Sequence, residues 1–361
     1  MSVKVHPAST GSPAIAEPSA LAATASRPAI FLRSHIKLLK LGLNSLVLTT
    51  TVVGFVLASR GHALDWPLLG WTLLGTALAA WGASAVNQWY ERDRDARMTR
   101  TRTRPLPAGQ LDPAYAFFLG LVLMASGDML LTWRVNPLTG LLALITQLVY
   151  LVWYTPLKTR STLNTLVGAI SGAIPPLIGA AAAAGRIDSA AWVLGAILFV
   201  WQVPHFLALA WMYREDYAHG GYVMLPCVDR NGQLTFGMIL AYSLLLIPLG
   251  LGLTLTGATG WLSAGLSLAL GLWLLVVAQR SQQSHSFQSA RKLFLTSVIY
   301  LPLLLLVFVA DRSRALPVPP GSVILQEQSG AVPAAASPSK PLDTPDQPSP
   351  TLNAQLANSP R

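Results

Sequence analysis

The feature that most constrains this chain is a series of nine apolar runs, each long enough or nearly long enough to cross a bilayer as a helix. A transmembrane helix needs about 20 residues. Within lipid, each backbone polar group must find its partner inside the segment, and no run alternates strictly as a strand does. We therefore predict an all-α, polytopic membrane protein. Its nine transmembrane helices are expected at residues 36–58, 66–90, 113–133, 137–154, 162–185, 190–212, 234–255, 261–278 and 292–310.

Composition excludes a soluble protein, because 52% of the residues are hydrophobic, only 11% are charged and the mean hydropathy is +0.49. The net charge of +10 resides largely in short loops between apolar runs. We therefore expect membrane lipid, and no nucleic acid, as the neighbour of these cations. The single cysteine, Cys227, excludes an internal disulfide and a cysteine-based metal cluster.

Lysine and arginine alternate between the two sets of loops. The loops after the second, fourth, sixth and eighth runs are rich in them, whereas the opposite loops offer only Arg60, Arg134 and Arg186. Because cytoplasmic loops carry the excess of basic residues, the amino terminus is expected in the cytoplasm and the carboxyl terminus on the opposite side. A bacterial inner (plasma) membrane is the expected location. The mitochondrial inner membrane is the alternative, since the amino-terminal segment is a weak targeting signal.

Three regions are expected along the chain. Residues 1–34 are predicted to be a disordered cytoplasmic tail, residues 35–312 the membrane-embedded domain, and residues 313–361 a disordered tail. The last segment is rich in Pro, Ser and Ala and contains too little apolar surface to order itself.

The charged stretch that ends the second run contains a candidate metal site. Asn87, Glu91 and Asp95 are four residues apart, so a helix would place them on one face over roughly 12 Å. Such oxygen ligands suit Mg²⁺, which also binds phosphate oxygens. The alternative is that these acids pair with neighbouring arginines in a solvated loop.

A second acidic pair, Glu215 and Asp216, follows the sixth run on the same predicted side of the membrane. Two acidic clusters that face each other can hold a diphosphate through Mg²⁺ ions, while basic side chains neutralise its oxygens. The topology makes four residues candidates for that basic role: Arg102, Arg104, Lys158 and Arg160.

In these motifs the chain resembles the UbiA-type membrane prenyltransferases. The first family signature is matched by Asn87, Glu91, Asp95 and the segment RTRTRPLP from Arg100. Signatures of the branch that farnesylates haem are matched by YTPLKTRSTLNTLVGAISGAIPPLIG from Tyr154, WQVPHFLALA from Trp201, DYAHGGYVMLP from Asp216 and ARKLFLTSVIYLPLL from Ala290. Together the matches extend over about residues 36–310.

The resemblance implies a nine-helix bundle whose cytoplasmic mouth binds Mg²⁺ and farnesyl diphosphate. It implies a Mg-dependent enzyme that transfers the farnesyl group to a vinyl group of haem b, with addition of water. The catalytic residues would be Asn87, Glu91, Asp95 and Asp216, with Glu215 as a further metal ligand. An association with the haem A synthesis step or with oxidase assembly is a further expectation.

The chain departs from the family pattern in three places. Ring-prenylating relatives usually have two Asp four residues apart in the second motif, whereas Met212 stands four residues before Asp216. Val223 replaces a common Pro, and the usual Lys-Pro-Arg at the first helix is replaced by residues 37–40. Because the second motif lacks the first of these two Asp residues, it favours a haem acceptor over the alternative, a quinone-precursor or chlorophyll-type acceptor. A transporter is a remote alternative, because no internal repeat is evident.

His205 lies within an apolar run, directly after Pro204. A neutral imidazole can bind haem iron, so His205 is a candidate haem ligand. The alternative is a packing histidine that is hydrogen-bonded to a nearby carbonyl.

Overall fold

The computed structural model describes residues 27–60 and 62–312, and within them it is all helical. The predicted fold class is confirmed: the described residues contain nine helices that are long and apolar enough to cross a membrane. The tails predicted at 1–34 and 313–361 lie outside the described residues, except for 27–34. Those eight residues belong to a helix, α1 (Arg27–Leu38), which begins before the predicted boundary at residue 35.

Six spans are formed by one continuous helix each. They are α2 (Leu41–Ala58), α3 (Trp66–Asp95), α9 (Ser189–Met212), α12 (Gln233–Leu255), α13 (Trp261–Ser284) and α14 (Phe287–Ala310). The most consequential boundary is that of α3, which continues through the charged residues to Asp95 rather than ending near residue 90.

The other three spans are interrupted. α4 (Pro113–Leu130) ends in a π-helical turn, Leu131–Val135, and α5 (Pro137–Leu148) continues through the π-helical Val149–Tyr154 into α6 (Thr155–Leu157). The fifth span divides into α7 (Asn164–Ala173) and α8 (Pro175–Ala184). The break falls at Pro175 and Pro176, since a proline removes a helical hydrogen bond and crowds the preceding turn.

Several helices begin where the sequence supplies a capping side chain. Asp65, Asp112 and Asn136 accept hydrogen bonds from the backbone N–H groups of α3, α4 and α5, respectively, and each is followed within two residues by a proline. A short polar acceptor followed by proline is a strong helix start, because the first N–H groups of a helix have no partner within it.

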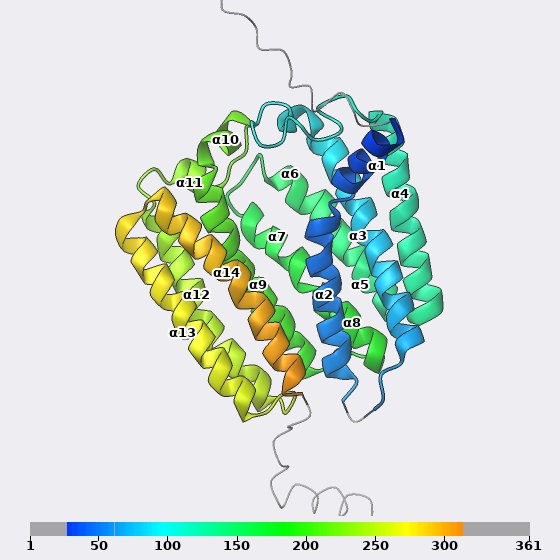
Figure 1. The fold of residues 1–361 in the computed structure, drawn as a ribbon, viewed down its shortest axis with the longest axis vertical. Helices are drawn as coiled ribbons and strands as arrows, with labels where there is room; N and C mark the ends of the chain where they lie inside the picture. Colours follow the sequence, from blue (N-terminus) through cyan, green and yellow to red (C-terminus); the bar gives the residue numbers. More distant parts are fainter. Residues whose placement is uncertain (1–26, 61, 313–361) are drawn as a thin grey trace, which may run out of the picture. The chain divides into compact units, whose positions relative to one another are not determined.

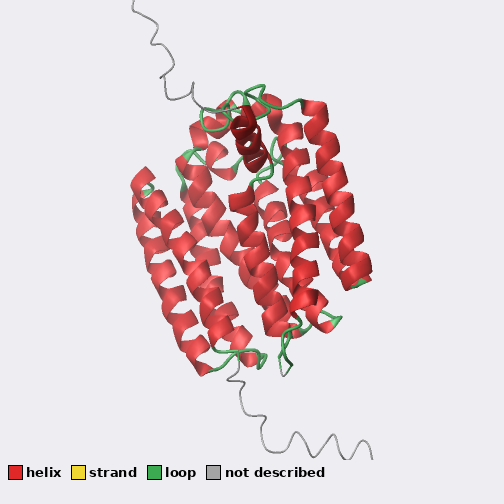
Figure 2. Ribbon diagram, turned by 45° about the vertical axis from the view of Figure 1, so that its right-hand side comes forward, coloured by secondary structure: helices red, strands yellow, loops and turns green. Residues whose placement is uncertain are grey.

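The helices pack in two neighbouring groups (Figures 1 and 2). α9, α12, α13 and α14 share the largest apolar core, which includes the fully buried Ile197, Phe236, Tyr300 and Phe308. α2, α3, α4, α5 and α8 lie beside them, with α3 against α4 and α2 against α8 as close pairs. The short helices α1, α6, α10 (Arg214–His219) and α11 (Leu225–Val228) gather at one end of the bundle.

That end carries the basic loops, and tryptophans mark the other. Trp66, Trp133, Trp192 and Trp261 stand at helix termini on the opposite end, each with 61 to 75% of its surface exposed. Exposed tryptophans at such a level are typical of a membrane–water interface. The described residues therefore form a multi-pass membrane domain with chemically distinct ends.

The approach of α2 to α8 depends on two glycines. A Cβ atom on Gly179 would overlap the carbonyl oxygen of Thr51, and one on Gly54 would overlap the carbonyl oxygen of Pro176. Backbone thus meets backbone, which only glycine permits at both positions.

Replacing Gly179 with Val should lower the free energy of unfolding by about 3 kcal/mol, because the Thr51 backbone cannot yield as a flexible side chain would. Thermal unfolding in detergent measures the effect. Gly265→Val in α13 is the matched control, since no atom lies within 4 Å of the added Cβ. Equal stability of the two variants would show that the close approach is not required.

Candidate active site

A cavity of about 470 Å³ lies among α2, α3, α5 with its π-helical extension, α7 and α9. Its deeper walls are mainly apolar and include Val47, Ala79, Ile178 and Leu198. Charged side chains gather at the end that bears the basic loops, among them Lys40, Glu91, Asp95, Arg104 and Lys158. The cavity is therefore apolar in depth and ionic at its mouth, as suits an amphiphilic ligand.

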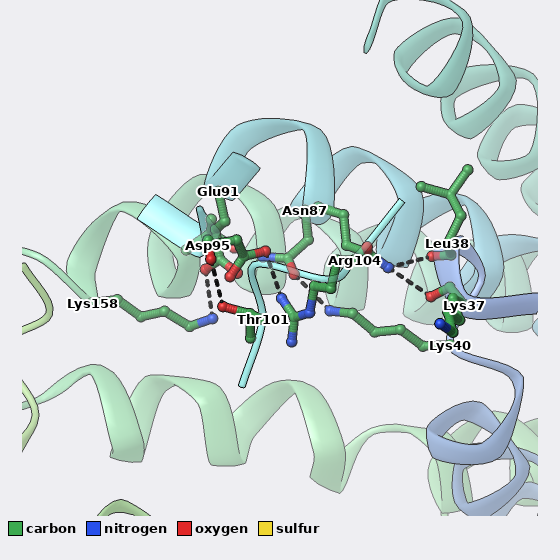
Figure 3. A network of polar contacts seen from close by, with 11 residues as sticks. Lys37, Leu38, Lys40, Asn87, Glu91, Asp95, Thr101, Arg104 and Lys158 are labelled. Atoms are coloured by element: carbon green, nitrogen blue, oxygen red, sulfur yellow. Dashed lines mark hydrogen bonds and ion pairs between the residues drawn. The ribbon is translucent and has the colours of Figure 1, made fainter. Parts of the chain in front are cut away.

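The amide and the two acids of the first motif lie in a row on α3 (Figure 3). Because α3 remains helical to Asp95, the spacing of four residues places Asn87, Glu91 and Asp95 on one face. Their exposed fractions are 0, 4 and 1%. The solvated-loop alternative does not apply to these three side chains, because they are buried.

A cation contacts each member of the row. Lys40 Nζ donates to Asn87 Oδ1 over 2.8 Å, Lys158 Nζ pairs with Glu91 Oε1 at 2.6 Å, and Arg104 Nη1 pairs with Asp95 Oδ2 at 2.6 Å. The cations come from three places in the chain: the α1–α2 junction, the residue after α6, and the arginine-rich loop. Burying three polar pairs of this kind costs free energy of folding, which indicates that they serve to bind a ligand.

Burial and neighbouring charge shift the pKa values of these cations in different directions. Burial, and then the neighbouring Arg104, lower the pKa of Lys40 to about 7. Burial opposes the charge on Lys158, but Glu91 and the neighbouring tyrosines together raise the Lys158 pKa well above its ordinary value. Burial likewise opposes the charge on Arg104, but the charge and hydrogen bond of Asp95, together with Glu91, raise the pKa of Arg104. Lys158 and Arg104 therefore remain charged at neutral pH, whereas the pKa of Lys40 lies close to neutral pH.

The side-chain oxygen atoms of this row are suitable ligands for a hard divalent cation. Asp95 Oδ1 is buried and has no hydrogen-bond partner among the described residues, while Oδ2 of the same carboxylate contacts Arg104. An amide and two carboxylates on successive turns provide the oxygen ligands that Mg²⁺ prefers. The present partners of these oxygens are cations that a phosphate would also attract.

The second acidic pair is placed differently. Asp216, on α10, accepts hydrogen bonds from the backbone N–H groups of Thr99, at 2.7 Å, and Arg100, at 3.3 Å. Glu215 is exposed, and both acids line a separate surface pocket. Across the described ranges, no cluster of three or more His, Cys, Asp or Glu side chains is positioned to hold a metal ion. Asp216 therefore anchors the arginine-rich loop here, and its carboxylate does not join the row on α3.

The four predicted basic residues also separate. Lys158 and Arg104 contact the acids, whereas Arg102 and Arg160 are exposed and do not line the cavity. Arg100, which the prediction omitted, lines the cavity, and its guanidinium lies 4.4 Å from the centre of the Tyr217 ring.

His205 lines the cavity from α9 and is stacked between Trp201 and Phe294. The Ser297 hydroxyl donates a hydrogen bond to the Phe294 carbonyl. Its oxygen is therefore the acceptor in the 2.9 Å contact with His205 Nδ1. This arrangement assigns the hydrogen to Nδ1 and leaves a lone pair on Nε2. The partner is a serine hydroxyl rather than the carbonyl that the packing alternative supposed.

Two site residues were not singled out by sequence reasoning. Lys40 lies at the break between α1 and α2 with φ 49°, a left-handed conformation that is unfavourable for lysine. Tyr222 lines the cavity with 5% of its surface exposed. Burial, and then the charge of Glu91, raise the pKa of the Tyr222 phenol, which keeps it protonated. A lysine at the edge of an apolar run was the available signal for Lys40. Tyr222 lies within the matched segment DYAHGGYVMLP, which gave it no individual role.

The sequence profile of the UbiA prenyltransferase family matches residues 47–302. A protein named protoheme IX farnesyltransferase, from Solibacter usitatus, is 42% identical over 289 residues, which cover 78% of this chain and 99% of the relative.

Two solved structures share the fold at 14% sequence identity. One, described in work on digeranylgeranylglyceryl phosphate synthase, has a TM-score of 0.67 and covers 78% of this chain and 98% of its own. The other, a UbiA homologue from Archaeoglobus fulgidus bound to GPP and Mg²⁺, has a TM-score of 0.61 and covers 77 and 99%, respectively. The family profile matches well over half of the chain and includes the row of acids, so this chain belongs to the UbiA prenyltransferase family.

Proposed function

We propose that the chain transfers the farnesyl group of farnesyl diphosphate to the vinyl group of haem b, with addition of water, giving haem O and diphosphate. The observation that carries this proposal is the buried row Asn87, Glu91 and Asp95, with its paired cations, at the mouth of an apolar cavity. The identity of 42% to a protein named for this reaction supports the choice of acceptor.

The row would hold Mg²⁺ through Asn87, Glu91 and Asp95. When bound, the ion supplies positive charge that stabilises a leaving diphosphate. Asp216 and Glu215 remain proposed as a second acidic cluster, because each carboxylate oxygen has a further lone pair to offer. Asp216 also accepts hydrogen bonds from the loop that carries Arg104.

Lys158 and Arg104 would neutralise the diphosphate oxygens, with Arg102 and Arg160 as more distant contributors. The C1–O bond of the allylic substrate breaks with both electrons moving to the diphosphate. The vinyl electrons of the acceptor then form the new bond to C1. Water adds to the cation left beside the pyrrole ring and loses a proton. The apolar walls protect the allylic cation from water until the acceptor reacts.

His205 would bind the haem iron through Nε2. Its support is geometric: the residue lines the cavity, and the Ser297 contact directs the hydrogen to Nδ1. A ring held between Trp201 and Phe294 loses little further freedom when it binds a ligand.

The proposed setting is a bacterial inner membrane with the basic end in the cytoplasm. The mitochondrial inner membrane is the alternative. This orientation follows the distribution of basic loops, and it places the carboxyl terminus across the membrane. The surrounding lipid is one partner, and an enzyme of haem A synthesis or oxidase assembly is proposed as another, since haem O must be passed on within the membrane.

The decisive experiment incubates purified protein in detergent with haem b, farnesyl diphosphate and Mg²⁺ and analyses the haem by mass spectrometry. We expect a product that has gained one farnesyl group and one hydroxyl. A parallel reaction offers 4-hydroxybenzoate as the acceptor. Prenylation of that ring, with no change in haem, would replace the proposal with an aromatic prenyltransferase.

A further inference from the structure

A second unpartnered polar atom lies at the same end of the cavity as Asp95 Oδ1. The Tyr222 hydroxyl is buried and has no hydrogen-bond partner among the described residues. A buried hydroxyl without a partner is unfavourable, so such a group in a cavity wall points to a ligand that it binds.

The polypeptide around Tyr222 is held firmly in place. The N–H of Tyr222 donates to the Tyr217 carbonyl at 3.0 Å, and the N–H of Val223 donates to the Lys158 carbonyl at 2.7 Å. The Asn164 amide donates to the Val223 carbonyl at 2.9 Å. The segment that carries the phenol is thus tied directly to the residue that contacts Glu91.

The side chain is equally restricted. The ring packs with Met98, Ala210 and Met224 in a small apolar cluster and lies 5.9 Å from Lys158 Nζ. Tyr222 lines the cavity together with Glu91, Asp95 and Arg104. A donor fixed beside these charges can act on an anion without reorganising when the anion arrives.

Two unsatisfied atoms of opposite kind therefore occur at the cavity mouth. Asp95 Oδ1 can only accept or bind a cation, whereas the Tyr222 hydroxyl can donate. The two are not bonded to each other, so a metal–anion pair would satisfy both, which neither ion alone would do.

We propose that the Tyr222 phenol donates a hydrogen bond to a diphosphate oxygen of the allylic substrate and keeps that bond as the C1–O bond breaks. The electron pair of the broken bond goes to the diphosphate, and the proton stays on the phenol. This inference rests on the proposed function for its substrate class. It assigns Tyr222 to the leaving group rather than to the acceptor.

The test compares Tyr222→Phe with Tyr300→Phe. Tyr300 is a matched control because it is fully buried in α14, its hydroxyl also lacks a partner, and it does not line the cavity. Thermal unfolding is measured in detergent, first without ligand and then over a range of inorganic diphosphate concentrations with Mg²⁺.

Without ligand, both variants should be at least as stable as the unmodified protein, since each loses an unpaired buried hydroxyl. With diphosphate, Tyr300→Phe should keep the full increase in melting temperature. Tyr222→Phe should bind diphosphate about tenfold more weakly, the effect of one hydrogen bond to a charged group. Its kcat for farnesyl transfer should fall by about 10- to 100-fold.

Two results would overturn the proposal. One is unchanged affinity of Tyr222→Phe for inorganic diphosphate. The other is lower ligand-free stability, or failure to fold, in Tyr222→Phe alone, because this would show that the hydroxyl bonds within the protein. The binding arm contains no haem. If Tyr222→Phe weakened diphosphate binding but the unmodified protein did not farnesylate haem, the role of Tyr222 would be supported. Only the proposal that haem b is the acceptor would be refuted.

Discussion

Replacing Asp95 with Asn should abolish farnesyl transfer, with a loss in kcat of at least about 10³-fold. The substitution keeps the shape of the side chain and leaves one oxygen that can accept from Arg104, but it removes the charge that a divalent cation requires. The unpartnered Oδ1 position then becomes an amide NH2 group, which cannot bind metal. Turnover is measured by mass analysis of the haem product, and folding by thermal unfolding.

Asp93→Asn is the control for that experiment. Asp93 is two residues away on the same helix, yet 76% of its side chain is exposed and it contacts only Arg92, at 3.6 Å. An exposed pair of this kind contributes little, so activity and stability should stay as they were. If the Asp95 variant retained full activity, the row on α3 would not be the metal site.

Replacing Lys158 with Met should destabilise the ligand-free protein by about 3–5 kcal/mol, because Glu91 would remain buried without its counter-charge. The same change should raise the Michaelis constant for farnesyl diphosphate, since a direct neutralising contact is lost. Denaturation in detergent gives the first quantity, and initial rates give the second.

The double variant with Glu91→Gln separates the two effects. It removes both charges of the pair, so most of the lost stability should return. Activity should be lost in the double variant, because Glu91 is a proposed metal ligand. Arg92→Met is the control: it removes the exposed contact with Asp93 and the contacts of Arg92 with Trp89, none of which lines the cavity, so both quantities should change much less. Continued instability of the double variant would show that Lys158 stabilises the fold through contacts other than Glu91.

The sequence was sufficient for the fold class and for the row of acids, for a physical reason. Long apolar runs admit only helices within lipid, and residues four apart on a helix must share a face. The spacing of Asn87, Glu91 and Asp95 was therefore informative as soon as α3 was taken to continue beyond the apolar run. Lys158 followed from topology, because the ends of alternate helices meet on one side of the membrane.

What the sequence did not reveal depends on irregular backbone. Asp216 contacts the N–H groups of Thr99 and Arg100 because a loop turns back on α10, and no periodic pattern encodes such a turn. Lys40 reaches Asn87 from a left-handed residue between two helices. The position of Tyr222 depends on a backbone contact with Lys158, which is distant in the sequence.

The pairing of acids and cations along α3 has a consequence for the order in which ligands bind. Glu91 and Asp95 are each balanced by a cation before any ligand arrives. A lone divalent ion would meet Lys158 and Arg104, and a lone polyanion would meet the carboxylates. Each would therefore bind weakly by itself. If the site binds diphosphate as proposed, each ligand would raise the affinity for the other by the same factor. The two internal ion pairs would then be exchanged for contacts with a metal–diphosphate complex that enters as one unit.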